Sequence, residues 1–180
     1  MRENNTDKDS TQNYFWGYLN SFTKNSTEED HIAFLKSMPF FHKLSTRQIK
    51  VISNYIHERV YEENEYFFEL DHPGAALFII KSGQVDIEIP NDARDGFTVV
   101  AQLSKGTFLG ELALLDNSPR TASAKATKRT VALSLFRDDL TQLMKLEPEI
   151  AAEIYKALAT LVGKRLVATT KLINELKAKK

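Results

Sequence analysis

The chain has 180 residues with 24 basic and 24 acidic side chains, so its formal net charge is zero and no overall charge attracts it to nucleic acid or an anionic membrane. Because the sequence has no cysteine, disulfides, thiolate zinc sites and a cysteine nucleophile are excluded. No stretch approaches the ~18 apolar residues of a membrane-spanning helix, and the polar N-terminus does not read as a signal peptide. We therefore expect a cytoplasmic protein without an integral membrane segment.

Residues 1–30 are expected to form an N-terminal extension. Residues 1–13 are polar, and residues 14–22 (YFWGYLNSF) are strongly aromatic. The aromatic segment is interpreted as a short helix that packs on the main domain or on a twin subunit. A membrane-surface role is the alternative, but it needs flanking basic residues and only Lys24 is close.

Two short helices are predicted next. The first runs through STEEDHIAFLKSM, with Ser26 or Thr27 as its N-cap and Pro39 as its end. The second covers STRQIKVISNYI, with Ser45 or Thr46 as its cap. The residues expected to face inward on the second helix are Ile49, Ile52 and Ile56.

From Val60 to Phe136 the pattern changes to short strands separated by turn residues, which is typical of a small antiparallel β-barrel or sandwich. The apolar segment ALFII is expected to be a central strand. Ser82-Gly83 is interpreted as the turn of a hairpin that joins this segment to QVDIEI. Further strands are predicted in FTVVAQL and VALSLF. Residues 31–137 are therefore expected to form the main domain, with the two helices at its start.

Residues 138–180 return to a helical period. A helix over DDLTQLMKL is broken at Pro148, and a long helix follows from about Glu149 to Lys177. Such a helix would extend about 43 Å, which is longer than one small barrel covers. We therefore expect part of its apolar stripe to pack on a second copy and form a homodimer. The stripe includes Ile154, Leu158, Leu161, Val162, Leu166, Ile173 and Leu176.

The segment FLGELALLDNSPRTAS, residues 108–123, interrupts the strand pattern. Its aliphatic run predicts a short helix, whose first N–H groups attract an anion. Gly110 permits close backbone approach to a ligand, and Arg120 offers a guanidinium suited to phosphate oxygens. Glu111 would repel phosphate unless its carboxylate accepts a hydrogen bond from another part of the ligand, such as a ribose hydroxyl. The pattern therefore predicts a ligand with a sugar at one end and a phosphate at the other.

At this point the sequence GTFLGELALLDNSPRTASAKA resembles the phosphate-binding cassette of the cyclic-nucleotide-binding domain family, found in the catabolite activator protein and protein kinase A regulatory subunits. Nine positions separate Glu111 from Arg120, as in that family. The resemblance extends over about residues 31–177. It implies an α+β fold: a small antiparallel jelly roll, also called a double-stranded β-helix, with N-terminal helices and a long C-terminal helix.

The resemblance also implies ligand contacts. Gly110 and Glu111 would hold the ribose 2′-hydroxyl, and Arg120 would hold the cyclic phosphate with the backbone of Ala113 and Thr121. The Thr121 hydroxyl permits cyclic GMP without requiring it, so the ligand is expected to be cAMP or cGMP, with no other cofactor and no metal. The full set of expected ligand-binding residues is Gly110, Glu111, Leu112, Ala113, Arg120, Thr121, Ala122, Thr169 and Thr170.

The two threonines lie on the long helix and rest on a softer match, in GKRLVATTKLINEL. In the resemblance their hydroxyls meet the base, with Thr170 reaching across a dimer. The alternative for Thr169 is a hydroxyl that bonds back to its own helix. Ligand capture is expected to move the two C-terminal helices as a lid that a protein effector recognises, with Leu114 or Leu115 as the apolar contact between cassette and lid.

Some features depart from the family. Asn64, Leu70 and Ala75 stand where the family commonly has Gly, Gly and Asp. The sequence ends at Lys180, too soon for a helix-turn-helix, so DNA binding is not expected. One alternative function is a protein-interaction scaffold in which Arg120 and Glu111 form only a structural salt bridge.

Enzymatic activity is not expected. The four histidines, His31, His42, His57 and His72, are scattered over different elements, and no paired-carboxylate, metal-spaced or Walker-type motif occurs in the sequence.

Overall fold

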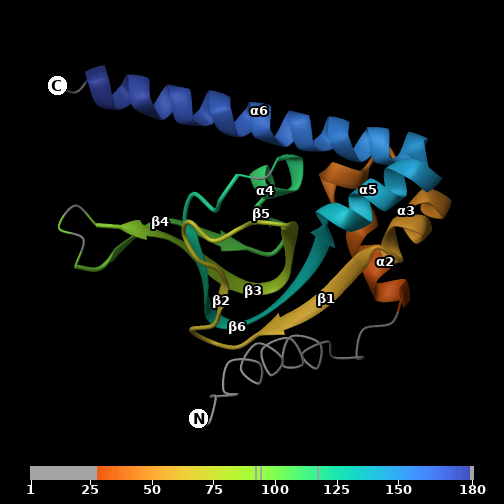
Figure 1. Ribbon diagram of the computed structural model, residues 1–180, viewed down its shortest axis with the longest axis horizontal. Coiled ribbons are helices and arrows are strands. Elements are labelled where there is room, and N and C mark those ends of the chain that lie inside the picture. Colours follow the sequence, from red (N-terminus) through yellow and green to blue (C-terminus); the bar gives the residue numbers. More distant parts are fainter. Residues whose placement is uncertain (1–27, 92, 94, 117, 179–180) are drawn as a thin grey trace, which may run out of the picture.

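The computed structural model describes residues 28–91, 93, 95–116 and 118–178 (Figure 1). The aromatic segment 14–22 and the predicted caps Ser26 and Thr27 lie outside these residues. Among the described residues, three short helical elements come first: α2 (Glu28–Ser37), η1 (Pro39–Phe41) and α3 (Thr46–Ser53). The strands are β1 (Ile56–Tyr61), β2 (Tyr66–Phe68), β3 (Ala76–Pro90), β4 (Phe97–Ser104), β5 (Phe108–Leu109) and β6 (Ser123–Phe136). The remaining helices are α4 (Leu112–Leu115), between β5 and β6, and then α5 (Arg137–Leu146) and α6 (Pro148–Ala178).

The six strands form one antiparallel sheet with the order β1-β6-β3-β4, in which β2 adds to β6 and β5 adds to β3. The expected fold class, an antiparallel jelly-roll-like β-roll with flanking helices, is confirmed. The main path of paired strands has two ends, at β1 and β4, so the roll is not a closed ring of hydrogen bonds. Figure 1 shows α6 running along one side of the roll, above α4 and β5.

The predicted hairpin at Ser82-Gly83 is wrong. ALFII and QVDIEI belong to one 15-residue strand, β3, which pairs along its length with β6. Gly83 has φ +100° and lies where the register against β6 shifts, so it is a bulge rather than a turn. Thr130 fills this bulge, because its hydroxyl accepts from the Gln84 N–H at 3.0 Å. A bulge bends a strand. Here β3 pairs with β5 before Gly83 and with β4 after it.

The first helices follow the sequence signals closely. α2 ends at Ser37, and Pro39 begins η1 one residue later, after Met38. Ser45 caps α3 in a capping box, since its side chain accepts from the Gln48 N–H and the Gln48 side chain accepts in return from the Ser45 N–H. The second predicted helix is too long, however. It ends at Ser53, and Ile56 is buried as the first residue of β1, because backbone pairing with Leu135 replaces the helical period there.

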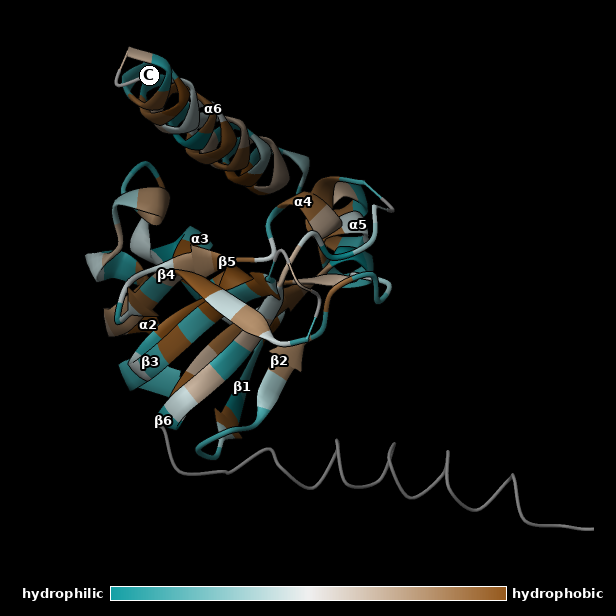
Figure 2. Cartoon of the chain, turned by 90° about the vertical axis from the view of Figure 1, so that its left-hand side faces the viewer, coloured by the Kyte–Doolittle hydropathy of each residue, from teal (hydrophilic) through white to brown (hydrophobic). Residues whose placement is uncertain are grey.

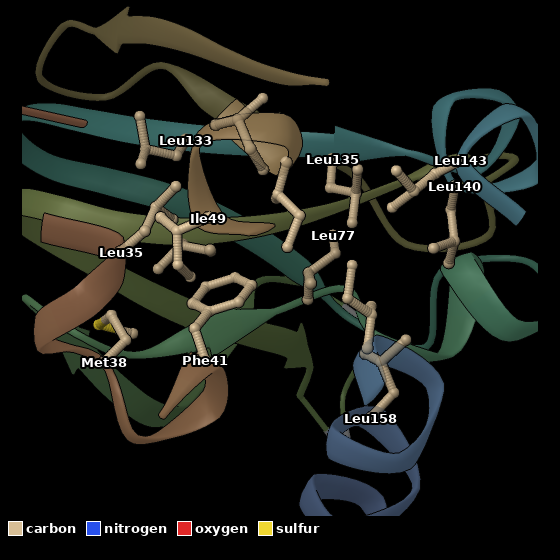
Figure 3. Packing of buried hydrophobic residues seen from close by; sticks show 14 of the residues in the cluster. Leu35, Met38, Phe41, Ile49, Leu77, Leu133, Leu135, Leu140, Leu143 and Leu158 are labelled. Atoms are coloured by element: carbon tan, nitrogen blue, oxygen red, sulfur yellow. The ribbon is translucent and has the colours of Figure 1, made fainter. Parts of the chain in front are cut away.

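In the part of the chain that the structure describes, two apolar clusters hold the helices and strands together. One fills the roll, where the rings of Tyr61 and Phe67 stack with their centroids 3.6 Å apart. The other joins the flanking helices and the start of α6 to the sheet (Figure 3). Residues labelled in Figure 3 include Leu35, Phe41, Ile49, Leu77, Leu133, Leu135, Leu140 and Leu158. The second cluster fixes the positions of α5 and α6 relative to the strands that carry the cassette.

The two halves of α6 differ in burial. Ile154 and Leu158 in the first half are buried in the core. In the second half Leu166, Leu172 and Leu176 are each more than half exposed, on a helix that mixes apolar and polar residues along its length (Figure 2). The predicted stripe therefore packs on this chain only in its first part. None of the described helices combines the length and the apolar character needed to cross a bilayer.

The bulge at Gly83 can be tested by substitution. A Cβ at Gly83 would overlap the Thr130 hydroxyl and lie 2.5 Å from Thr130 Cα, in a backbone conformation that disfavours side chains. We expect Gly83→Ala to lower the free energy of unfolding by about 1–3 kcal/mol in urea denaturation. Gly163→Ala is the matched control, because its Cβ would meet no atom within 4 Å. In a helix, alanine in place of glycine raises the free energy of unfolding by about 0.5–1 kcal/mol. Equal effects of the two substitutions would contradict the bulge.

Candidate functional site

A cavity of about 330 Å³ lies between the roll, α4 and α6. Seven of the nine predicted ligand-binding residues line it: Gly110, Glu111, Leu112, Ala113, Arg120, Thr121 and Ala122. Thr169 and Thr170 do not line it; both are exposed on α6. Apolar walls come from Phe68, Ile87, Ala101, Leu103 and Leu109, with Pro119 and Arg165 completing the lining. The structure thus gathers the cassette around one cavity and leaves the two threonines outside it.

Gly110 lets its own backbone lie close to the Arg120 side chain. Its φ is +78°, which glycine adopts readily and other residues rarely do. A Cβ at this position would overlap Nη1 of Arg120 and lie 3.0 Å from the Ala76 carbonyl oxygen. Gly110 is therefore needed both for its backbone conformation and for the space that the guanidinium occupies.

Arg120 is buried, with only 6% of its surface exposed. Its Nη1 donates to the Gly110 carbonyl at 3.2 Å and its Nη2 donates to the Ala76 carbonyl at 3.0 Å. The guanidinium carbon lies 4.0 Å from the centroid of the Phe68 ring, in cation–π geometry. These contacts hold a positive charge in a fixed orientation at the cavity wall.

Glu111 is equally buried and forms an ion pair with Arg165, whose Nη1 lies 2.5 Å from Oε2. Arg165 belongs to α6 and also donates to the Phe108 carbonyl. Arg165 was not predicted as a site residue, because a basic residue on a long amphipathic helix is usually solvated. Its position four residues before Thr169, on the helix expected to cover the ligand, was the available signal.

Arg137, the first residue of α5, links that helix to α4 and was also missed. Its Nε donates to the Ala113 carbonyl at 3.1 Å, and its Nη2 donates to the Asp116 carbonyl at 2.6 Å. The same Nη2 donates to the Gly74 carbonyl at 2.5 Å. One guanidinium therefore ties α4 and the loop before β3 to the start of α5.

The turn after α4 is organised by Asp116. Its carboxylate accepts from the Ser118 N–H at 3.0 Å and from the Ser118 hydroxyl at 2.6 Å. The hydroxyl bond is the larger cause that lowers the pKa of the Asp116 carboxyl below its usual value. The turn returns the chain to Arg120, whose N–H donates to the His72 carbonyl at 2.9 Å.

Other predicted positions divide between the core and the surface. Leu114 is buried in the core cluster that includes α5 and α6, whereas Leu115 is exposed. The Thr170 hydroxyl donates to the Leu166 carbonyl at 2.9 Å, which is the bond back to the helix that had been considered for Thr169. Asn64, which stands at a family glycine, has φ +70°, a conformation that asparagine tolerates better than most residues.

His31 and His57 pair with carboxylates, and neither lines the cavity. His31 Nε2 is 3.0 Å from the Glu58 carboxylate, which also accepts from Lys81 at 2.7 Å. His57 Nε2 is 2.9 Å from the Asp139 carboxylate. Within the described ranges, no group of three or more histidine or acidic side chains is arranged to hold a metal ion.

Comparison with known proteins places these features in a family. Residues 58–147 match the model of the cyclic nucleotide-binding domain. The chain is 33% identical over 132 residues to a cyclic AMP receptor protein from Thermus thermophilus, covering 73% of this chain and 59% of the relative. It is 32% identical over 111 residues to a cGMP-dependent protein kinase from Eimeria tenella, covering 62% of this chain and 10% of the relative.

Solved structures agree with the sequence relatives. The crystal structure of the catabolite activator protein from Thermus thermophilus superposes with a TM-score of 0.68 at 29% identity, over 77% of this chain and 63% of that one. This chain thus spans only part of the length of these relatives. The family model covers half of the sequence and includes the whole cassette around the cavity. The chain therefore belongs to the cyclic nucleotide-binding domain family.

Proposed function

We propose that the protein is a cyclic-nucleotide sensor that binds cAMP or cGMP in the cassette cavity and relays binding to a protein effector. The observation that carries this proposal is the position of Arg120 and Glu111, which are both buried and both line one cavity. A buried guanidinium and a buried carboxylate at the same cavity suit a ligand with an anionic part and a hydroxyl-bearing part. A cyclic nucleotide has its phosphate and its ribose 2′-hydroxyl in one rigid molecule.

In this proposal Arg120 holds the cyclic phosphate. The two carbonyls and the Phe68 ring orient the guanidinium before the ligand arrives, so little side-chain entropy is lost on binding. Glu111 accepts a hydrogen bond from the ribose 2′-hydroxyl. A carboxylate has two oxygens, so the pair with Arg165 through Oε2 leaves Oε1 as an acceptor for the sugar.

The role of Arg120 can be measured directly. We expect Arg120→Ala to weaken binding of cAMP or cGMP by about 10- to 150-fold, because a charge-assisted hydrogen bond contributes about 1.5–3 kcal/mol. Isothermal titration calorimetry gives both dissociation constants.

Arg129→Ala is the matched control, because Arg129 is an exposed arginine whose pair with Glu62 spans 3.6 Å at the surface. Its dissociation constant should remain that of the wild type. Equal affinity of the Arg120 variant and the wild type would contradict the assignment, and so would absence of binding to the wild type. The second result would favour a scaffold that has lost its ligand.

We propose that the relay runs from α4 to the two C-terminal helices. Arg137 joins the Ala113 and Asp116 carbonyls to the start of α5, and Arg165 joins Glu111 to α6. Leu114 adds an apolar contact to the cluster that holds both helices. A ligand that draws the cassette inward would therefore change the position of α5 and α6, and with it the surface that an effector meets.

Hydrogen exchange tests this relay. We expect saturating cAMP or cGMP to alter amide exchange in residues 137–165 of the wild type. Arg137→Gln should reduce that response, because it removes the charged donors that link α4 to α5. Arg129→Gln should leave the response unchanged. Exchange that did not depend on the nucleotide anywhere beyond residue 138 would contradict the relay.

We also propose that the second half of α6 forms a homodimer. This half-helix exposes Leu166, Val167, Leu172 and Leu176, which is unfavourable in water unless another surface covers them. In such a dimer Thr170 would approach the nucleotide of the partner, as the family resemblance implies. Sedimentation equilibrium should give a dimer for the wild type and a monomer for Leu172→Glu. A monomeric wild type at tens of micromolar would contradict the proposal.

A further inference from the structure

A second cavity, also about 330 Å³, lies between η1 and α6, and none of its lining residues lines the cassette cavity. Its apolar wall consists of Pro39, Phe40, Leu44, Phe108, Ala157 and Leu161. The rings of Phe40 and Phe108 lie with their centroids 4.6 Å apart, and Phe40 also packs against Phe41 in edge-on geometry. A cavity of this size with a mainly apolar lining and a few polar groups has the character of a small-molecule site.

The polar part of the lining is basic. It contains Lys43, Lys156, Lys164 and His42 but one acidic side chain, Glu153. Glu153 lies 3.9 Å from Lys156 on the same helix. Within the described residues, Lys43 and Lys164 form no ion pair. One lysine comes from the segment after η1 and the other from α6, so their charges flank the cavity from two elements.

From this geometry we propose that the cavity binds a small amphipathic anion: an aliphatic body with one carboxylate. The apolar wall would take the aliphatic body, and Lys43 and Lys164 would meet the carboxylate at the rim. The lining differs in kind from that of the cassette cavity, which has a buried arginine and a buried glutamate in its wall.

The position of the cavity connects it to the cassette. Phe108 lines the second cavity and its carbonyl accepts from Arg165, the residue that pairs with Glu111. Lys164 is the neighbour of Arg165 on α6. An anion bound between η1 and α6 would therefore influence the position of α6. The ion pair between Glu111 and Arg165 depends on that position. This coupling rests on the proposed nucleotide function, but the anion site itself does not.

The experiment is a calorimetric titration of the full chain with decanoate in the absence of nucleotide. We expect saturable binding with one site per chain, and weaker binding of 1-decanol, which has the same body without the charge. Lys43→Gln with Lys164→Gln should weaken decanoate binding by about 2- to 30-fold, the range for two exposed charge pairs. Lys128→Gln with Lys177→Gln, which changes two exposed lysines elsewhere, is the matched control.

A second variant tests the cavity by volume. Ala157→Trp places a large ring in the lining of the cavity and should abolish binding while circular dichroism remains that of the wild type. Arg120→Ala should leave decanoate binding unchanged, which separates this site from the nucleotide site. The proposal is overturned if decanoate does not bind, if 1-decanol binds equally well, or if a folded Ala157→Trp variant binds as the wild type does.

Discussion

The buried guanidinium of Arg120 is the constraint on which the cassette depends. A cation removed from water needs polar partners, and here the Gly110 and Ala76 carbonyls and the face of Phe68 provide them. Two glycines make the room. A Cβ at Gly110 would overlap the guanidinium, and one at Gly74 would lie 2.9 Å from its Nε. The left-handed backbone of Gly110 and the turn through Asp116 and Ser118 are thus parts of one arrangement around a single charge.

Two further arginines connect this arrangement to the helices. Arg137 binds carbonyls of α4 from the start of α5, and Arg165 reaches Glu111 from the middle of α6. Both contacts are charged and partly open to solvent, so a ligand that competes for them or shifts them can change their strength. The apolar cluster around Leu158 limits how far the first half of α6 can move. Movement is therefore expected to concentrate around Arg165 and beyond it.

Much of the fold and of the candidate site could be predicted from the sequence, and the predictions that were wrong or missing have physical reasons. The cassette was recognisable because its chemistry lies within sixteen consecutive residues, so no long-range contact was needed to assemble it. Gly83 was misjudged because a glycine with positive φ suits a turn and a bulge equally well, and only the pairing of β3 with β6 distinguishes them. Arg137 and Arg165 were missed because their roles depend on residues 24 and 54 positions away, which periodicity does not show.

The central claim is that Arg120 and Glu111 hold the two polar ends of one cyclic nucleotide. A crystal structure of the protein grown with saturating cAMP or cGMP tests it most directly. The account predicts a cyclic phosphate within hydrogen-bond distance of the Arg120 guanidinium and a ribose hydroxyl on the Glu111 carboxylate. A cavity without nucleotide, with Glu111 still bound only to Arg165, would contradict it, and so would a nucleotide bound elsewhere on the molecule.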